Sequence, residues 1–365
     1  MLCSSHAVPN SEVNFDSSVT TLDNAGIAEL LARESETASH ILQRALRRAA
    51  RRAFLWPEEA ADLMREGRSL TEFSGIGPYL EKLIRGWLEN PPENPLPPEI
   101  RQNFLTLPKA RTLLSANPVW QTKLRGDLQM HTNWSDGSGT IQEMAQSAAE
   151  RGYEYIAITD HAKGLKIAGG IDEEQLLLQR KEIDGINQAF GKLEKPLRVL
   201  RSIELNLNPR GEGDLDAQAV SKLDLVLGCF HSALRKTEDQ TARYLAALRN
   251  PAIHILGHPR GRIYNFRLGL RADWLKVFAL AAKLDKAVEI DAYPDRQDLD
   301  LTLLRAARES GVKISIGTDA HHPWQLLFIE LGLASALSAK IPAKRILNFM
   351  SCDELLAWAS HTRKI

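Results

Sequence analysis

Histidines and acidic residues recur at the ends of hydrophobic, strand-like runs between residues 124 and 322. Imidazoles and carboxylates are the ligands that first-row divalent metals take, and they are rarely buried without a partner. A series of them after successive strands predicts one polynuclear metal site, which is the chemistry of a metal-dependent hydrolase. The segments are Asp-Leu-Gln-Met-His at 127–131, Thr-Asp-His at 159–161, Ser-Ile-Glu at 202–204, Cys-Phe-His-Ser at 229–232, Gly-His-Pro at 257–259, Glu-Ile-Asp at 289–291 and Thr-Asp-Ala-His at 318–321.

The elements that would position these residues alternate from residue 124 onward between short β-rich runs and helical patterns. Seven β-α units predict parallel strands, because each right-handed crossover returns the chain to the same edge of the sheet. An open doubly wound sheet also fits. Ligands after all seven strands favour a closed barrel, in which every strand end reaches one mouth. The sequence therefore predicts an α/β fold with a (β/α)7 barrel over residues 124–365.

The chain before the barrel divides into three parts. Residues 1–20 are polar without periodicity and predict a flexible tail. Residues 21–90 have helical periodicity and predict a small all-α domain. Residues 91–123 predict a linker followed by one or two connecting helices, because five prolines fall within 90–98 and exclude a helix there.

The composition mainly excludes some classes of protein and partner. The 365 residues are 44% hydrophobic and 25% charged, with 46 basic and 46 acidic side chains, so any basic surface must be local. Three widely separated cysteines predict no disulfide framework. No apolar run approaches the roughly 18 residues needed to span a bilayer, so no membrane partner is expected. The first residues lack the features of a signal peptide, and a cytoplasmic location is expected.

Taken in order along the chain, these motifs resemble those of a known protein family. The chain resembles the PHP (polymerase and histidinol phosphatase) superfamily, and it looks most similar to the PHP domains of bacterial family X DNA polymerases. The matching segments are GDLQMHTNWSDG (126–137), ITDHAKGL (158–165), IEL (203–205), HS (231–232), GHPRGR (257–262) and GTDAHHP (317–323). The resemblance implies a distorted (β/α)7 PHP barrel. It also implies nine ligand positions for three metals, at Gln129, His131, Asp136, His161, Glu204, His231, His258, Asp319 and His321.

The resemblance also implies roles for these ligands. Glu204 can bridge two ions that share a water and clamp the oxygens of a phosphoryl displacement. Two to three Zn²⁺ or Mn²⁺ ions are expected, because imidazole-rich sites disfavour Mg²⁺. The catalytic candidates are Glu204, His258 and Asp319. The first ion would take His131 and Asp319 with Glu204, the second His231 and His258, and the third Asp136, His161 and His321.

Gln129 departs from the family, in which most active members carry a histidine at this position. A glutamine amide is a neutral and weaker ligand. The first ion is therefore expected either to be held loosely or to be a metal that tolerates oxygen donors.

Basic residues in the loops after the ligand-bearing strands are candidate substrate contacts. Guanidinium groups suit bidentate contacts with phosphate. The candidates are Lys163, Arg260, Arg262 and Arg296, and Lys163 and Arg262 are favoured because each lies close to a proposed ligand in the sequence.

The helical segment carries a second, independent signal. LTEFSGIGPYLEKLI (70–84) has the Gly-Ile-Gly pattern of a helix-hairpin-helix, in which Gly75 and Gly77 permit a tight turn able to hold one DNA phosphate. No acidic residue interrupts 40–53, where basic residues recur at helical spacing and predict a phosphate-tracking surface. Those residues are Arg44, Arg47, Arg48, Arg51 and Arg52.

Residues 24–90 resemble the N-terminal DNA-binding domain of family X polymerases. Too few residues separate this segment from the barrel for a polymerase core. The lysine of lyase-active relatives falls on Leu83, with Lys82 out of register. Neither polymerase nor lyase activity is therefore expected.

Three functions fit these features. The leading hypothesis is a metal-dependent phosphoesterase acting on DNA without sequence preference, as a 3′-5′ exonuclease or 3′-phosphatase, with a role in DNA repair. The alternatives are a histidinol-phosphate-type phosphatase of small molecules and a DNA-binding scaffold whose barrel is weakly active because of Gln129.

Overall fold

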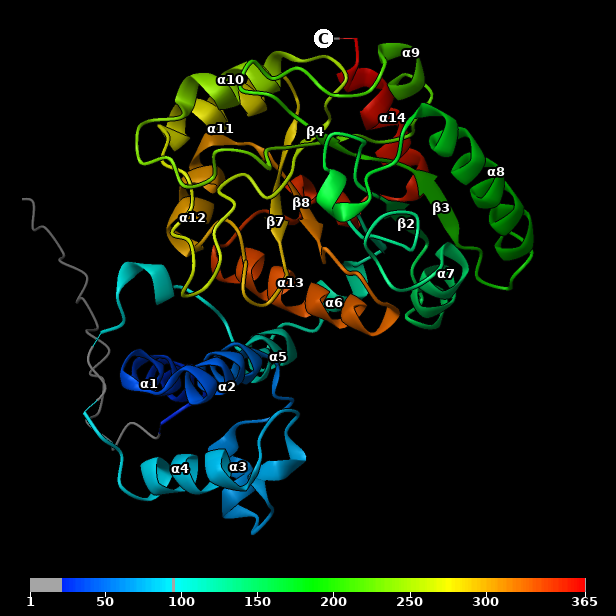
Figure 1. The fold of residues 1–365 in the computed structure, drawn as a ribbon. Coiled ribbons are helices and arrows are strands. Elements are labelled where there is room, and N and C mark those ends of the chain that lie inside the picture. The colour runs from blue at the N-terminus through cyan, green and yellow to red at the C-terminus, as the bar shows by residue number, and fades with distance from the viewer. Residues whose placement is uncertain (1–21, 94–95, 365) are drawn as a thin grey trace, which may run out of the picture.

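The structure is a computed structural model that describes residues 22–93 and 96–364. The tail expected at residues 1–20 lies outside the described residues. Two bodies are visible in Figure 1, an all-helical part near the N-terminus and a larger α/β part. Among the described residues, no helix combines the length and apolar character that crossing a bilayer requires.

The N-terminal part is built from four helices around one apolar core. Asp23 caps the first helix by accepting a hydrogen bond from the Gly26 N–H, and Pro78 begins the last one, where its missing N–H costs nothing. α3 and α4 lie on the side of α1 and α2 away from the α/β part (Figure 1). The helices are α1 (Asn24–Thr37), α2 (His40–Arg52), α3 (Ala60–Arg65) and α4 (Pro78–Glu89).

The connecting segment runs along the α/β part. Its described residues in 90–98 contain no helix. α5 (Leu107–Ser115) and α6 (Val119–Lys123) follow, and α5 packs on α13 (Ile329–Ser338). The Arg111 guanidinium lies 2.7 Å from a Glu330 carboxylate oxygen, which ties α5 to α13.

All described strands in the larger part are parallel, in two sheets with orders β1-β2-β3 and β4-β5-β6-β7-β8. This confirms the α/β class. The expected closed barrel is not present as one continuous sheet. Isolated bridges at Met130–Ala320 and His161–Glu204 join the two sheets. The strands are β1 (Gly126–Asp127), β2 (Tyr155–Ile158), β3 (Arg198–Arg201), β4 (Glu204–Asn206), β5 (Leu227–Cys229), β6 (Ile255–Leu256), β7 (Ala287–Asp291) and β8 (Lys313–Gly317).

The sheet divides because the third expected strand is interrupted at Ser202 and Ile203. The part before the interruption, β3, pairs with β2, whereas the part after it, β4, pairs with β5. The break places Glu204 at the start of a new strand, where its backbone N–H donates to the Asp160 carbonyl.

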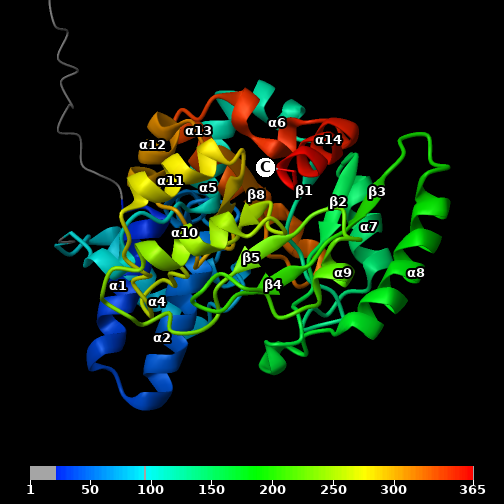
Figure 2. The ribbon, with the colours of Figure 1, turned by 90° about the horizontal axis from the view of Figure 1, so that it is seen from above.

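Helices cover the outside of the strands, as Figure 2 shows. Side-chain caps fix where several of them begin, including capping boxes at Thr140 and Asp172. Apolar side chains of strands and helices pack together beneath this layer. The remaining helices are α7 (Ile141–Glu150), α8 (Glu173–Phe190), α9 (Ala217–Val220), α10 (Thr241–Arg249), α11 (Trp274–Lys283), α12 (Leu301–Ser310) and α14 (Cys352–Thr362).

Tyr264 anchors the helical part to the α/β part. Its ring is 2% exposed within the helical core, 4.8 Å from the Phe54 ring, and its hydroxyl donates to the Ala28 carbonyl. The Arg101 guanidinium adds two hydrogen bonds of 2.8 and 2.9 Å to Glu29. Because Tyr264 lies in the loop after β6, the helices are fixed beside the carboxyl ends of the strands.

Candidate metal centre

Glu204 is the centre of the site. Its carboxylate is fully buried at the start of β4 and faces four imidazoles that follow other strands. Oε1 lies 2.6 Å from His231 Nε2, 2.8 Å from His258 Nε2 and 3.6 Å from His161 Nδ1. Oε2 lies 3.3 Å from His131 Nε2. One carboxylate therefore contacts side chains from the ends of β1, β2, β5 and β6.

Asp319 extends the site on the side of His131. Its Oδ1 lies 3.0 Å from His131 Nε2, and both side chains are buried. Asp319 and His258 both have positive φ values, +52° and +23°, which are unfavourable for residues other than glycine. Such strain persists only where surrounding contacts fix it, and it is concentrated at functional sites.

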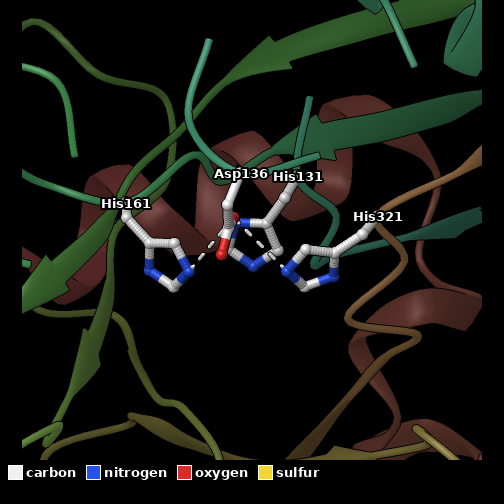
Figure 3. Close-up of side chains that lie close together, drawn as sticks. All are labelled: His131, Asp136, His161 and His321. Carbon is white, nitrogen blue, oxygen red and sulfur yellow. Dashed lines mark ion pairs between the residues drawn. The ribbon is translucent and has the colours of Figure 1, made fainter. Parts of the chain in front are cut away.

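A third group of ligands lies nearer to solvent. Asp136 Oδ1 is 3.5 Å from His161 Nε2 and 3.4 Å from His321 Nε2, and 35% of the Asp136 side chain is exposed. The rings of His161 and His321 both stack on His131, with centroids 4.3 and 4.5 Å away. Figure 3 shows the three imidazoles grouped around the Asp136 carboxylate.

The unsatisfied nitrogens show that this set fits divalent ions. Nδ1 of His131 and Nδ1 of His161 are buried without a hydrogen-bond partner, and His131 Nε2, although 3.0 Å from Asp319 Oδ1, is not aligned for a hydrogen bond. An unsatisfied buried polar group costs about 1–3 kcal/mol, a cost that coordination of a cation would remove. Four overlapping groups of these residues have ligand atoms within 4.8 Å of one another. Imidazole with carboxylate is a donor set suited to zinc or manganese.

The charges support the same conclusion. Burial opposes ionisation of Glu204, yet the neighbouring histidines, His258 first, hold the pKa of that carboxyl well below its usual range. Burial likewise opposes ionisation of Asp319, and Arg296 followed by His131 lowers the pKa of its carboxyl. Both carboxylates are therefore available as anionic ligands at neutral pH.

Gln129 enters the site as a hydrogen-bond donor. Its Nε2 donates to Glu204 Oε2 at 2.7 Å, while its Oε1 is buried without a partner. The space is tight, because a Cβ added at Gly317 would lie 2.5 Å from the Gln129 Cβ and 2.4 Å from Glu289 Oε1. In this geometry the amide contacts the Glu204 carboxylate through its NH₂ group.

A family comparison identifies the domain that carries most of this site. Residues 127–293 match the PHP domain family. This part of the chain is a PHP domain. A relative of this domain is named as a probable phosphatase, and the candidate metal ligands lie within and just after the matched stretch.

Two relatives illustrate the range of the family. DNA polymerase/3′-5′ exonuclease PolX of Bacillus subtilis (strain 168) is 35% identical over 72% of this chain, and this chain spans 45% of that relative. A protein named probable phosphatase from Thermoanaerobacter sp. (strain X514) is 28% identical over 62% of this chain and 91% of its own length. A solved structure, histidinol phosphate phosphatase of Lactococcus lactis with zinc, L-histidinol and phosphate, covers 59% of this chain and 93% of its own, with 17% identity and a TM-score of 0.44.

Four further polar residues of the PHP domain lie at the site outside the proposed ligand set, and three of them contact a proposed ligand. Cys229 lies within ligand distance of Glu204 and His258. Asn206 Oδ1 is 3.0 Å from His231 Nδ1, and Glu289 accepts the His258 backbone N–H at 2.7 Å. Asp291 lies 3.5 Å from the Arg296 guanidinium, and burial followed by Asp319 raises the pKa of Asp291 to about 8. The Glu-Ile-Asp segment at the end of β7 was the available signal for two of them.

The basic residues predicted to contact substrate lie in different environments in the structure. The Arg296 guanidinium pairs with Asp319 and so reaches the centre. Lys163 is exposed and pairs with Glu173 at 2.7 Å. Arg260 pairs with Asp300 at 2.7 Å and donates to the Leu268 carbonyl.

Arg262 does not take the role expected of it. It is 4% exposed, and its guanidinium donates to the backbone carbonyls of Asn103 and Arg296 at 2.7 and 2.9 Å. Its Cζ lies 3.9 Å from the Phe104 ring centroid. Arg262 therefore joins the connecting segment to the PHP domain. Because carbonyls and an aromatic ring already surround its guanidinium, its donors are not free for the predicted contact with phosphate.

In the helical part, the structure brings the two predicted DNA-contacting features together. Arg44 and Arg48 are exposed on α2. Arg52 lies against the hairpin, since a Cβ added at Gly75 would lie 2.1 Å from its guanidinium, and Gly75 has a φ of +86°. Gly77 caps α4 in an extended conformation. Arg51 lies 3.7 Å from Asp295 in the loop after β7.

Proposed function

We propose that this chain is a metal-dependent phosphoesterase that acts on DNA, as a 3′-5′ exonuclease or 3′-phosphatase, in DNA repair. The observation that carries the proposal is Glu204 with four imidazoles within 3.6 Å, in a domain that is anchored to an arginine-bearing helix. The name of the PolX relative, which includes a 3′-5′ exonuclease, supports the choice of DNA. The helical part up to residue 90 would bind DNA, and residues 124–365 would carry the chemistry.

The proposed centre takes two to three Zn²⁺ or Mn²⁺ ions. Bound there, such ions would polarise the phosphoryl group and lower the pKa of a water. Glu204 would bridge two of them, with His131 and Asp319 on one side and His231 and His258 on the other. Asp136, His161 and His321 would hold the third.

Neighbouring groups orient the ligands. Asn206 Oδ1 accepts from His231 Nδ1, which leaves Nε2, 2.6 Å from Glu204 Oε1, as the ring nitrogen that would face a metal. The Asp319 carbonyl accepts from His321 Nδ1 at 2.7 Å, which leaves its Nε2 facing Asp136. Such hydrogen bonds fix the tautomer and the orientation of each ring. Arg296, paired with Asp319, is placed to hold a phosphate oxygen of the substrate.

Two alternatives make different predictions. A small-molecule phosphatase of the histidinol-phosphate type would leave the arginine-bearing helix without a function, although the phosphatase names of other relatives favour it. A DNA-binding scaffold with weak activity would follow if the contact between Gln129 and Glu204 prevents metal binding.

An assay on labelled DNA distinguishes the three. The purified chain is incubated with Mn²⁺ and with single-stranded, duplex and gapped DNA labelled at the 5′ or 3′ end, beside histidinol phosphate. We expect release from the 3′ end, its loss in Glu204→Gln, and its retention in Glu309→Gln, which alters an exposed carboxylate on α12. Hydrolysis of histidinol phosphate alone would favour the first alternative. DNA binding without hydrolysis would favour the second.

A further inference from the structure

A partly exposed tryptophan lies in the segment after β8, the segment that also carries the proposed ligand His321. Trp324 follows the proposed ligand His321 by three residues and is 49% exposed. Its ring packs at right angles on the buried Phe328, with centroids 5.4 Å apart. The side chain is therefore held in place while part of its apolar surface remains open to a ligand.

A second aromatic side chain, Tyr293, contacts the same Phe328 ring and lies near Arg296. Tyr293, in the loop after β7, is partly exposed and its ring also packs on Phe328, with centroids 5.2 Å apart. The Arg296 guanidinium lies 5.5 Å from the Tyr293 ring centroid and pairs with Asp319. Trp324, Phe328, Tyr293 and Arg296 thus form a connected row that ends on a proposed metal ligand.

We propose that Trp324 and Tyr293, here called the aromatic platform, stack unpaired bases of the DNA strand whose phosphate lies at the metal centre. The platform rests on the proposed function and adds specificity-determining residues to it. Aromatic rings stack on any base, at a gain sufficient to change affinity several-fold or more. Arg296 at one end supplies the positive charge that the phosphate of the same nucleotide requires.

The surroundings favour a nucleic acid strand as the occupant. Asp295, next to Arg296, pairs with Arg51 of α2, so the platform lies close to the arginine-bearing helix. Positive charge along a backbone path together with rings for the bases is the combination that single-strand binding uses. A duplex end presents paired and stacked bases, so the platform predicts a preference for unpaired ends.

Fluorescence of a base analogue tests stacking without requiring catalysis. A short oligothymidylate with 2-aminopurine near its 3′ end is titrated with the full chain in the absence of turnover. Stacking on Trp324 should quench the probe. Trp324→Ala should abolish the quenching and weaken binding by between about fivefold and about 150-fold, whereas Trp324→Phe should retain most of both. Leu275→Ala, at an exposed apolar position on α11, should behave as the original chain.

Kinetics on two substrates separate the possible outcomes. Trp324→Ala should lower kcat/KM on the oligonucleotide and leave hydrolysis of a small phosphomonoester unchanged. Equal losses on both substrates would show that Trp324 supports the metal centre and would overturn the platform. Unchanged quenching and affinity in Trp324→Ala would also overturn the platform. The proposed function would remain if the original chain still hydrolyses DNA. Failure of the original chain to bind or cleave the oligonucleotide would overturn the proposed function, and the platform with it.

Discussion

Replacing Arg262 tests whether this residue binds substrate or holds the chain together. Its guanidinium makes short hydrogen bonds to the carbonyls of Asn103 and Arg296 and lies over the Phe104 ring. Charge-assisted hydrogen bonds contribute about 1.5 kcal/mol or more each. A desolvated cation–π contact adds about 2 kcal/mol. Release of the buried charge offsets part of the loss, so Arg262→Ala should lower the free energy of unfolding by about 3 kcal/mol.

The expected result is a loss of stability that affects the attachment of the connecting segment first. Urea unfolding followed by circular dichroism gives the free energy, and limited proteolysis between residues 90 and 105 reports on the segment. Arg262→Lys should lie between the original chain and the alanine variant, because an ammonium group cannot reach both carbonyls in the same geometry.

Arg271→Ala is the matched control, since Arg271 is exposed and lines a pocket that Arg262 and Phe104 also line. It should change the free energy of unfolding by no more than about 0.5 kcal/mol. If Arg262→Ala unfolds like the control but raises KM for a phosphate-bearing substrate, the structural role is refuted and the phosphate contact predicted from the sequence is restored.

Three further predictions address the metals, DNA and pH. Gln129→His should increase the metal retained after dialysis, measured by elemental analysis, because imidazole is the stronger ligand; unchanged content would place residue 129 outside the coordination sphere. Arg48→Ala should reduce the slope of log Kd against log salt for duplex DNA by about 0.9, while Arg65→Ala on α3 should leave it unchanged. Burial lowers the pKa of His254 from 6.5 to about 3, so the folded state binds fewer protons between these values and stability is lost as pH falls. The free energy of unfolding should therefore fall less between about pH 7 and about pH 5 in His254→Gln than in the original chain. Parallel curves of unfolding free energy against pH for the two proteins would contradict this.

The convergence of the candidate ligands could be predicted because it depends on local order in the chain. A polar residue directly after a buried parallel strand must lie at the carboxyl edge, and successive strands bring such residues together whatever the loops do. His131, His161, His231 and His258 all contact Glu204 for this reason.

The role of Arg262 could not be predicted, since it depends on where a distant segment packs. Arg260 and Arg262 lie in the same loop and looked equivalent, yet Arg262 bonds to residues about 160 positions away. The interruption of the third strand was equally hidden. The sequence from Leu197 to Leu207 reads as one β-rich run, and only the pairing of its two halves with different neighbours divides it.

The relation between the helical part and the metal centre follows from contacts of unequal strength. The Arg51–Asp295 pair spans 3.7 Å with 53% of the arginine side chain exposed, and such pairs contribute about 0–1 kcal/mol. Tyr264 is buried in the helical core, and full burial of an aromatic side chain contributes about 1.5–3 kcal/mol. Tyr264, rather than the ion pair, therefore fixes α2 beside the loop that carries Asp295 and Arg296. Arg296 in turn pairs with Asp319 at the metal centre. The position of DNA bound on α2 relative to that centre would therefore be set by the apolar contacts of Tyr264, which salt does not screen.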